Sequence, residues 1–170
     1  MEEDDGAVNF SGQTLDHLRQ ASAFLDYEAD LLDRHAFREW LALWDRNGRY
    51  ILPIERGETD FENSLNHIYD DHTMRSQRIE RLLSGHAPSA TPVMRTVRSV
   101  SRVRLLGAEH GRLLVSSSLL IVSYKRQVQK LLAADVTHLL ALLPDSIRID
   151  EKIVRLIDSD EPLPELSFLP

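Results

Sequence analysis

The chain has 170 residues, a net charge of −7, 42% hydrophobic and 28% charged residues, and no cysteine. These values predict one ordinary globular domain that buries about 70% of its unfolded surface. The negative charge disfavours nucleic acid or an anionic membrane as a partner. The lack of cysteine excludes disulfides, thiolate metal sites and a cysteine nucleophile.

The first residues are acidic and no apolar run reaches the roughly 18–20 residues of a membrane span, so we expect a cytoplasmic protein. Residues 1–13 predict a flexible N-terminal arm, and residues 14–170 a single α+β domain. From Thr14, which can cap a helix, apolar residues recur at helical spacing. A break near residues 33–35 divides this stretch into two helices, and residues 45–48 predict a turn after the second.

A short strand is predicted for residues 50–54, which read YILPI. Pro53 cannot donate a hydrogen bond to a β-ladder, so its presence indicates an edge strand or a bulge. The polar residues 55–65 that follow are typical of a loop.

Residues 68–83, IYDDHTMRSQRIERLL, lie at the centre of the chain and run from a short apolar piece through two adjacent carboxylates into a predicted capped helix. Asp70 or Asp71 can serve as the N-cap, because either carboxylate can accept the unpaired amide protons of the first turn. Arg75 projects into the apolar arc of this helix, and an ion pair with Asp71, four residues earlier, is expected to balance it. The alternative is that Asp71 is a catalytic residue at the mouth of a pocket.

After a cluster of helix breakers at residues 84–92, the hydrophobic period changes to two. Residues 93–106 predict a strand whose odd positions face the core and whose even positions carry arginines outward. Residues 112–126 predict a second long strand with two apolar faces. The second face needs a cover, either a helix or another chain.

Residues 131–143 fit both a helix and a strand. A short turn at residues 144–146 leads into a further predicted strand at residues 147–158, which favours an antiparallel hairpin and therefore a strand. Helices followed by a run of strands predict an α+β fold, with N-terminal helices packed on a curved, mostly antiparallel sheet. Such a sheet closed by helices forms a cone-shaped roll that can hold a pocket.

Four segments in order resemble the small (β) subunit of the oxygenase component of Rieske non-haem iron aromatic-ring-hydroxylating dioxygenases. They read LLDRHAFREWLALWDRNGRYILPI, YDDHTMRSQRIERLL, HAPSATPVMRTVRSVSRVRL and EKIVRLID. The resemblance covers nearly the whole chain. It implies a cystatin-like cone of the scytalone-dehydratase and ketosteroid-isomerase type.

The resemblance also implies a structural subunit without catalytic residues or cofactors of its own. Its partners would be itself, as a homotrimer, and a large α subunit carrying the Rieske iron-sulfur cluster and the mononuclear iron, together forming a hexamer. Which aromatic substrate such a complex handles is not encoded in any recognisable motif. The alternative from a different class is a free-standing dehydratase or isomerase of the same fold, with Asp71 or His138 as acid and base and Tyr69 as a donor.

Two further clusters could carry a site. His67 and His72, with the carboxylates of Asp70 and Asp71, have the residue types of a two-histidine, one-carboxylate iron site. The two histidines would straddle a strand-to-helix boundary with no third ligand marked, so no metal site is predicted. A second cluster, formed by the aromatic residues Trp40, Trp44 and Tyr50, is expected in the core rather than in a ligand pocket.

Arg95, Arg98, Arg102 and Arg104 place four positive charges on one strand of an acidic chain. They form either a solvated strand face or a subunit interface in which arginines pair with carboxylates of another chain. The apolar outer face expected on the neighbouring strand favours the interface.

Overall fold

The structure, a computed structural model, describes residues 11–84, 94–161 and 168–170. Its elements in chain order are α1 (Gly12–Asp33), α2 (Phe37–Ala42), β1 (Trp44–Pro53), β2 (Asn66–Asp70), α3 (His72–Ser84), β3 (Arg95–Glu109), β4 (Arg112–Lys125), β5 (Val128–Leu143) and β6 (Ser146–Leu156).

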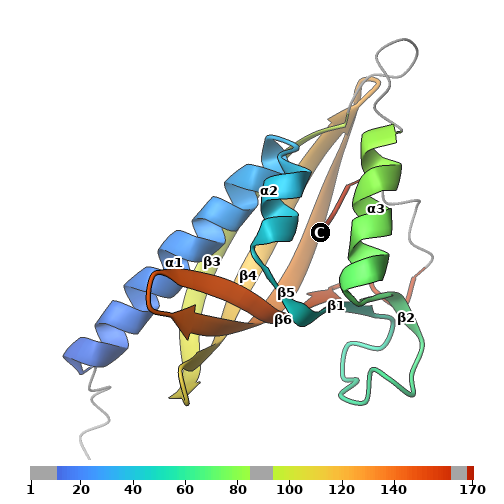
Figure 1. Cartoon of the computed structure of the whole chain (residues 1–170). Helices are drawn as coiled ribbons and strands as arrows, with labels where there is room; N and C mark the ends of the chain where they lie inside the picture. The colour runs from blue at the N-terminus through green and yellow to red at the C-terminus, as the bar shows by residue number, and fades with distance from the viewer. Residues whose placement is uncertain (1–10, 85–93, 162–167) are drawn as a thin grey trace, which may run out of the picture.

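The strands form one sheet in the order β2-β1-β6-β5-β4-β3. Every neighbouring pair is antiparallel except β1 and β6, which run parallel. The sheet curves, and the three helices lie on one of its faces (Figure 1). The predicted α+β class, with N-terminal helices on a curved and mostly antiparallel sheet, is therefore confirmed.

The hydrophobic core fills the space between the helices and the inner face of the sheet. The strands β4 and β5 turn alternate side chains into this space, whereas β1 and β6 each contain a run of consecutive buried residues. The largest apolar side chains with less than 2% exposure are Trp40, Tyr50, Leu25, Leu31, Leu32, Ile51, Leu52, Ile79, Leu113, Ile121 and Leu140. The three aromatics Trp40, Trp44 and Tyr50 pack edge to face, with ring centroids 5.3–5.8 Å apart, as core residues.

The two predicted N-terminal helices are present, separated by a break at residues 34–36. The cap of the first is Ser11 and not Thr14, because the Ser11 hydroxyl accepts the Thr14 amide proton at 3.1 Å. α1 therefore begins at Gly12, inside the segment that was expected to be an arm. Residues 1–10, most of that arm, lie outside the described residues, as do residues 85–93 of the breaker cluster.

The strand predicted at residues 50–54 is the second half of β1, and its register shifts between Leu52 and Pro53. Of the two alternatives predicted from the missing proline donor, the register shift agrees with the bulge, and the edge strand is wrong because β1 lies between β2 and β6. The turn predicted at residues 45–48 is wrong, since these residues belong to the irregular first half of β1. Gly48 fits there because a β-carbon would lie 2.8 Å from the Ile149 carbonyl oxygen.

The predicted facing of β3 is correct at one end and reversed at the other. Thr96, Arg98 and Val100 point inward, whereas Val97 is 68% exposed. The register with β4 shifts after residue 101, and Arg102 adopts a positive φ of 53°. This bulge changes the phase of the alternation, so that only the later odd positions face the core as predicted.

The remaining strands follow the predictions closely. β4 covers nearly the range expected for it, and its odd residues from Leu113 to Ser123 are buried. The ambiguous segment at residues 131–143 lies in β5, a strand, and β5 pairs antiparallel with β6 as the expected hairpin.

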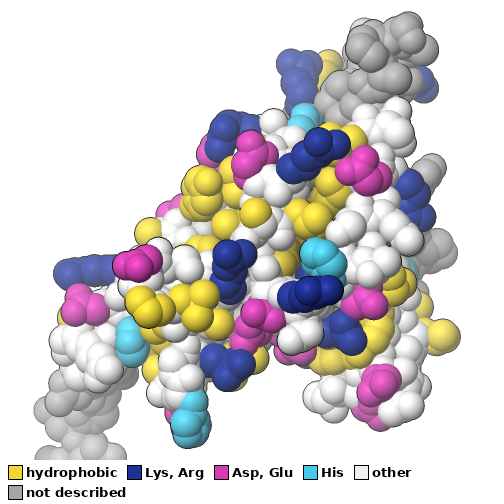
Figure 2. All heavy atoms as spheres, viewed as in Figure 1, with side chains coloured by type: hydrophobic (Ala, Val, Ile, Leu, Met, Phe, Trp, Pro, Cys, Tyr) yellow, Lys and Arg dark blue, Asp and Glu magenta, His cyan; other side chains and the backbone are white. Residues whose placement is uncertain are grey.

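The face of the molecule that carries the helices has a mixed surface. Figure 2 shows basic, acidic and hydrophobic side chains interspersed there. Among the residues that the structure describes, no helix is long and apolar enough to cross a lipid bilayer.

Candidate functional site

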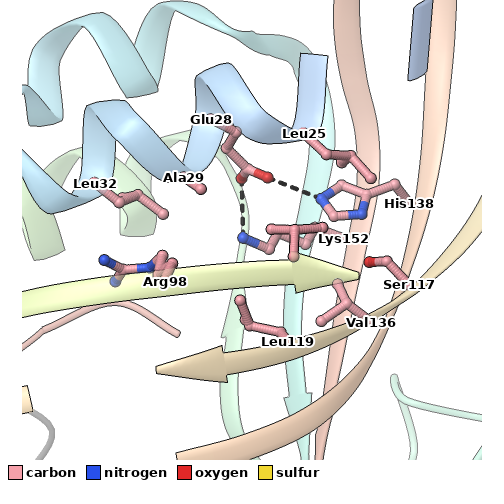
Figure 3. A pocket seen from close by; sticks show the side chains of 11 residues that line it. Leu25, Glu28, Ala29, Leu32, Arg98, Ser117, Leu119, Val136, His138 and Lys152 are labelled. Carbon is pink, nitrogen blue, oxygen red and sulfur yellow. Dashed lines mark hydrogen bonds and ion pairs between the residues drawn. The ribbon is translucent and has the colours of Figure 1, made fainter. Parts of the chain in front are cut away.

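A small pocket lies inside the cone, between α1 and the inner face of the sheet (Figure 3). Its interior volume is about 20 Å³, which has room for about one water molecule. The lining combines an apolar wall with a few ionisable groups. The residues that line it are Leu25, Glu28, Ala29, Leu32, Arg98, Val100, Ser117, Leu119, Val136, His138 and Lys152.

Glu28 is the centre of a buried polar network in this pocket. Its Oε2 lies 3.0 Å from His138 Nε2, and its Oε1 accepts hydrogen bonds of 2.9 Å from both Lys152 Nζ and Trp40 Nε1. Glu28, His138 and Lys152 are each only 3% exposed. Every member of this charged cluster therefore has a partner, as burial requires.

The backbone explains why these three side chains meet. Glu28 follows Leu25 by three residues and precedes Leu32 by four, so it lies on the buried stripe of α1. His138 and Lys152 are direct cross-strand partners in the β5–β6 ladder, which places their side chains next to each other on the inner face.

The network sets the charge of each group. Burial alone would raise the pKa of Glu28, but Lys152 and His138 outweigh it and lower that pKa far below its ordinary value. Burial lowers the pKa of Lys152, and Glu28 opposes this shift. Burial likewise lowers the pKa of His138, against the opposing effect of Glu28. At neutral pH the site therefore holds the Glu28 carboxylate beside an uncharged His138 imidazole.

Arg98 enters the same pocket from β3. Its side chain is 2% exposed, and its guanidinium donates to the carboxylate of Asp33 and to the backbone carbonyl of Leu169. Asp33 also accepts from the Thr96 hydroxyl and from the Arg98 amide, each at 2.8 Å. The prediction that Arg98 lies on an outward face is wrong, because the bulge at Arg102 changes the facing of the strand.

The structure places the other three arginines of that set outside. Arg95, Arg102 and Arg104 are exposed, and Arg95 lies over the ring of Tyr124, 4.9 Å from its centroid. Their role at an interface stays a prediction.

The residues proposed for an acid–base site are not brought together. His138 lines the pocket, but Asp71 and Tyr69 do not. Asp71 caps α3, its Oδ1 accepting the Met74 amide at 2.9 Å. Tyr69 alternates along β2 with the inward-facing Ile68 and Asp70, so it points to the opposite face, where Arg49 lies 5.9 Å from its ring centroid.

Arg75 does not form the expected ion pair with Asp71. The buried Arg75 guanidinium donates to the carbonyl oxygens of Gly48 at 2.6 Å and Asp70 at 3.2 Å, and it stacks 4.1 Å from the Trp44 ring centroid. Backbone carbonyls at a strand end can satisfy a guanidinium as a carboxylate would. Burial lowers the pKa of Arg75 to about 10.

The candidate iron ligands each have a separate environment. Asp70 accepts two hydrogen bonds from Arg78, at 2.6 and 2.9 Å, and His67 Nε2 lies 2.8 Å from the Ser159 carbonyl oxygen. His72 is exposed at the first position of α3. Among the described residues, no group of three or more histidines or carboxylates is arranged to hold a metal ion.

Sequence reasoning missed Glu28, Lys152 and Asp33. A signal was present for two of them. Glu28 interrupts the apolar stripe of α1, and Lys152 alternates in β6 with the buried Val154 and Leu156. Two opposite charges on predicted core faces are a reason to expect a buried pair.

The profile of the family described as "Ring hydroxylating beta subunit" matches residues 27–160. The N,N-dimethyl phenylurea N-demethylase subunit beta of Sphingobium sp. strain YBL2 is 29% identical over 171 residues, which covers 96% of this chain and 97% of that protein. The benzene 1,2-dioxygenase subunit beta of Pseudomonas putida F1 is 30% identical over 120 residues, covering 65% of this chain and 63% of that protein.

Solved structures show the same architecture. The beta subunit of benzoate 1,2-dioxygenase from Burkholderia mallei ATCC 23344 superposes with a TM-score of 0.75 at 18% identity, over 96% of this chain and 100% of that one. A putative scytalone dehydratase from Novosphingobium aromaticivorans DSM 12444 superposes with a TM-score of 0.64 at 10% identity, over 84% of this chain and 85% of that one. At these identities the likeness shows the fold, and it confirms the cone of the scytalone-dehydratase type.

Proposed function

The chain belongs to the ring-hydroxylating beta-subunit family, and we propose that it is the structural, non-catalytic small subunit of an aromatic-ring-hydroxylating dioxygenase. The observation that carries the proposal is the family match across residues 27–160. The redox chemistry then belongs to a large α subunit that holds a Rieske cluster and a mononuclear iron. The assembly works in the cytoplasm, with which a chain without cysteine is compatible.

The chemistry of the pocket supports a structural role. Both oxygens of Glu28 are hydrogen-bonded to side chains of the same chain, on α2, β5 and β6. The carboxylate therefore holds α1 against the sheet. Asp71 and Tyr69, the acid–base candidates of the free-standing dehydratase, lie outside the pocket that contains His138. The dehydratase alternative thus has no assembled acid–base pair among the residues predicted for it.

The outer face of the sheet supports assembly with another polypeptide. Val97, Val122 and Leu131 are cross-strand neighbours on β3, β4 and β5, and Leu120 follows beside them. Val97 and Leu131 are each 68% exposed and Leu120 is 44% exposed. We call these four residues the outer apolar patch. Contiguous apolar side chains on a sheet face are typical of an interface, and we propose a second copy of this chain as the cover, within a homotrimer that supports three large subunits as a hexamer.

Co-expression with a large-subunit partner tests the proposed function. We expect the two chains to purify together, with iron bound to the large chain and oxygenation of an aromatic ring that requires that chain. The variants Asp71→Asn and Tyr69→Phe should leave turnover unchanged, because Asp71 caps α3 and neither residue lines the pocket. Turnover by the small chain alone, or its loss in either variant with the assembly intact, would refute the non-catalytic role.

The proposed interface has its own test. Leu131→Glu places a charge in the outer apolar patch, and we expect it to dissociate the trimer in sedimentation velocity while the circular dichroism spectrum stays unchanged. The matched control is Leu65→Glu, since Leu65 is 79% exposed in the loop before β2 and outside the patch. Equal sedimentation of both variants and the original chain would exclude the patch as the interface.

A further inference from the structure

Residues 168–170, which we call the tail, lie inside the cone and not on its surface. Leu169 is 1% exposed and Pro170 is also buried, while the half-buried Phe168 packs against the hydrophobic core. In the view of Figure 1 the end of the chain, marked C, lies between α2 and α3. The tail belongs to none of the helices and strands that the structure describes, so its position depends on other contacts.

Two side chains from distant strands bind the main chain of the tail. The Tyr50 hydroxyl on β1 donates to the main-chain oxygen of Pro170 at 2.5 Å, and the Arg98 guanidinium on β3 donates to the carbonyl oxygen of Leu169. Both donor side chains are almost completely buried. The tail is thus held as a protein holds a bound peptide, with donors for its main-chain oxygens and an apolar environment for its side chains.

The two donors are fixed by contacts that do not involve the tail. Arg98 forms an ion pair with Asp33, and Tyr50 packs edge to face against Trp40 and Trp44. Such support keeps both side chains in place when the tail is displaced. A buried hydroxyl and a buried guanidinium N–H would then each lose an acceptor, which favours filling the same place again.

The selectivity of this place follows from the side chain at Leu169. Main-chain oxygens are common to all peptides, so the hydrogen bonds from Tyr50 and Arg98 do not discriminate between sequences. Full burial of a leucine side chain corresponds to roughly tenfold or more in a binding constant. A charged side chain at the same position would be buried without a partner. A peptide held here therefore needs an aliphatic residue at the position of Leu169.

We infer that the interior of the cone contains a peptide-binding site, which the tail occupies in this structure and which accepts a short apolar peptide from outside when the tail is displaced. The site needs no open space beyond that which residues 168–170 already fill. The inference goes beyond the proposed function and does not rest on it, because every group that forms the site belongs to this chain.

A full-length variant with a displaced tail tests the inference. Leu169→Asp places a carboxylate in the apolar site and should release the tail. A fluorescent peptide with the sequence of residues 165–170, ELSFLP, should then bind saturably with one peptide per chain. Fluorescence anisotropy should show binding at least tenfold tighter than to the original chain, because the tail of the original chain competes. The same peptide carrying Leu169→Asp should bind at least tenfold more weakly than ELSFLP.

The matched control for the displaced tail is Leu65→Asp. Leu65 is 79% exposed in the loop before β2, so this variant should bind the peptide as weakly as the original chain does. Equal peptide binding by folded Leu169→Asp and by Leu65→Asp would overturn the inference. If Leu169→Asp does not fold, Leu169→Ala is the milder change and should bind at least threefold more tightly than the original chain. No increase in this variant would equally overturn the inference.

A second pair of variants locates the bound peptide. Tyr50→Phe, added to Leu169→Asp, removes the donor to the main-chain oxygen of Pro170 and should weaken peptide binding about fivefold. Tyr27 is 49% exposed on α1, so Tyr27→Phe added to Leu169→Asp should leave the affinity unchanged. Equal affinity in the two double variants would show that the peptide binds elsewhere, and it would contradict the assignment.

Discussion

Glu28 on α1 and Lys152 on β6 form a buried ion pair of 2.9 Å across 124 residues of sequence. This contact joins the first helix to the last strand. The pair cannot be judged as an ordinary surface salt bridge, because both side chains are almost completely removed from water.

Removing one member of this pair should be costly. Glu28→Gln retains an acceptor for Trp40 but leaves the Lys152 ammonium buried without a counter-charge, so we expect a loss of about 3–5 kcal/mol in the free energy of unfolding. Urea denaturation measures it. The double variant Glu28→Gln, Lys152→Met should lose clearly less than the sum of the two single variants. Additive losses would mean that the two charges are not coupled.

Acid should destabilise the fold in two stages. The pKa of His138 lies below 6.5 in the folded chain because of burial, so the unfolded chain takes up that proton first and stability falls as the pH drops below about 6.5. The pKa of Glu28 is lowered from 4.5, so stability that is present above this pH is lost on further acidification.

Urea denaturation from pH 7.5 to pH 3.5 follows both stages. The difference between the original chain and His138→Gln isolates the first stage from the other histidines, and the second stage should persist in that variant. A constant difference between the two proteins from pH 7.5 to pH 5 would contradict the assignment to His138.

Two glycines provide a matched pair for close packing in β1. A β-carbon at Gly48 would lie 2.8 Å from the Ile149 carbonyl oxygen and 3.1 Å from the Asp45 carbonyl oxygen, whereas at Gly57 nothing lies within 4 Å. Gly48→Ala should therefore lower the free energy of unfolding by about 1–3 kcal/mol through overpacking. Gly57→Ala should change it by less than about 0.5 kcal/mol. Thermal unfolding of both variants measures this difference. Equal melting temperatures would disprove the close approach of Gly48 to the Ile149 carbonyl oxygen.

The role of Asp71 as a helix cap predicts a graded response. Asp71→Ala removes the acceptor of the Met74 amide and should cost about 1 kcal/mol of stability. Asp71→Asn retains an oxygen at the same place and should cost only a few tenths of that amount. A large loss in Asp71→Asn would show that the negative charge itself is needed. Chemical denaturation distinguishes these outcomes.

The fold could be predicted from local patterns to a large extent. Helical spacing located α1 and α2 with the break between them, and a period of two located the long strands, because each element buries one continuous face. Even the ambiguous segment in β5 was resolved correctly by the short turn that follows it. Such patterns are local, and they hold wherever the backbone is regular.

The candidate site was mostly beyond prediction, for two physical reasons. The positive φ of Arg102 marks a bulge that reverses the facing of β3, and no feature of an alternating sequence indicates where such a bulge falls. The pairing of Glu28 with Lys152 depends on tertiary contact between distant segments. Outside that site, the partners of Arg75 were also missed, because they are backbone carbonyls, which no side-chain pattern reveals.

The position of β1 between β2 and β6 has a consequence for how the chain folds. β1 pairs with β2 soon after it is made, but its other edge stays open until β6 is complete, since Tyr50 lies opposite Lys152 in the parallel ladder. Pairing across such a separation is slow, and an open strand edge invites association with other chains. Nascent chains that stop short of Leu156 should therefore aggregate, and refolding yield should fall steeply as the protein concentration rises.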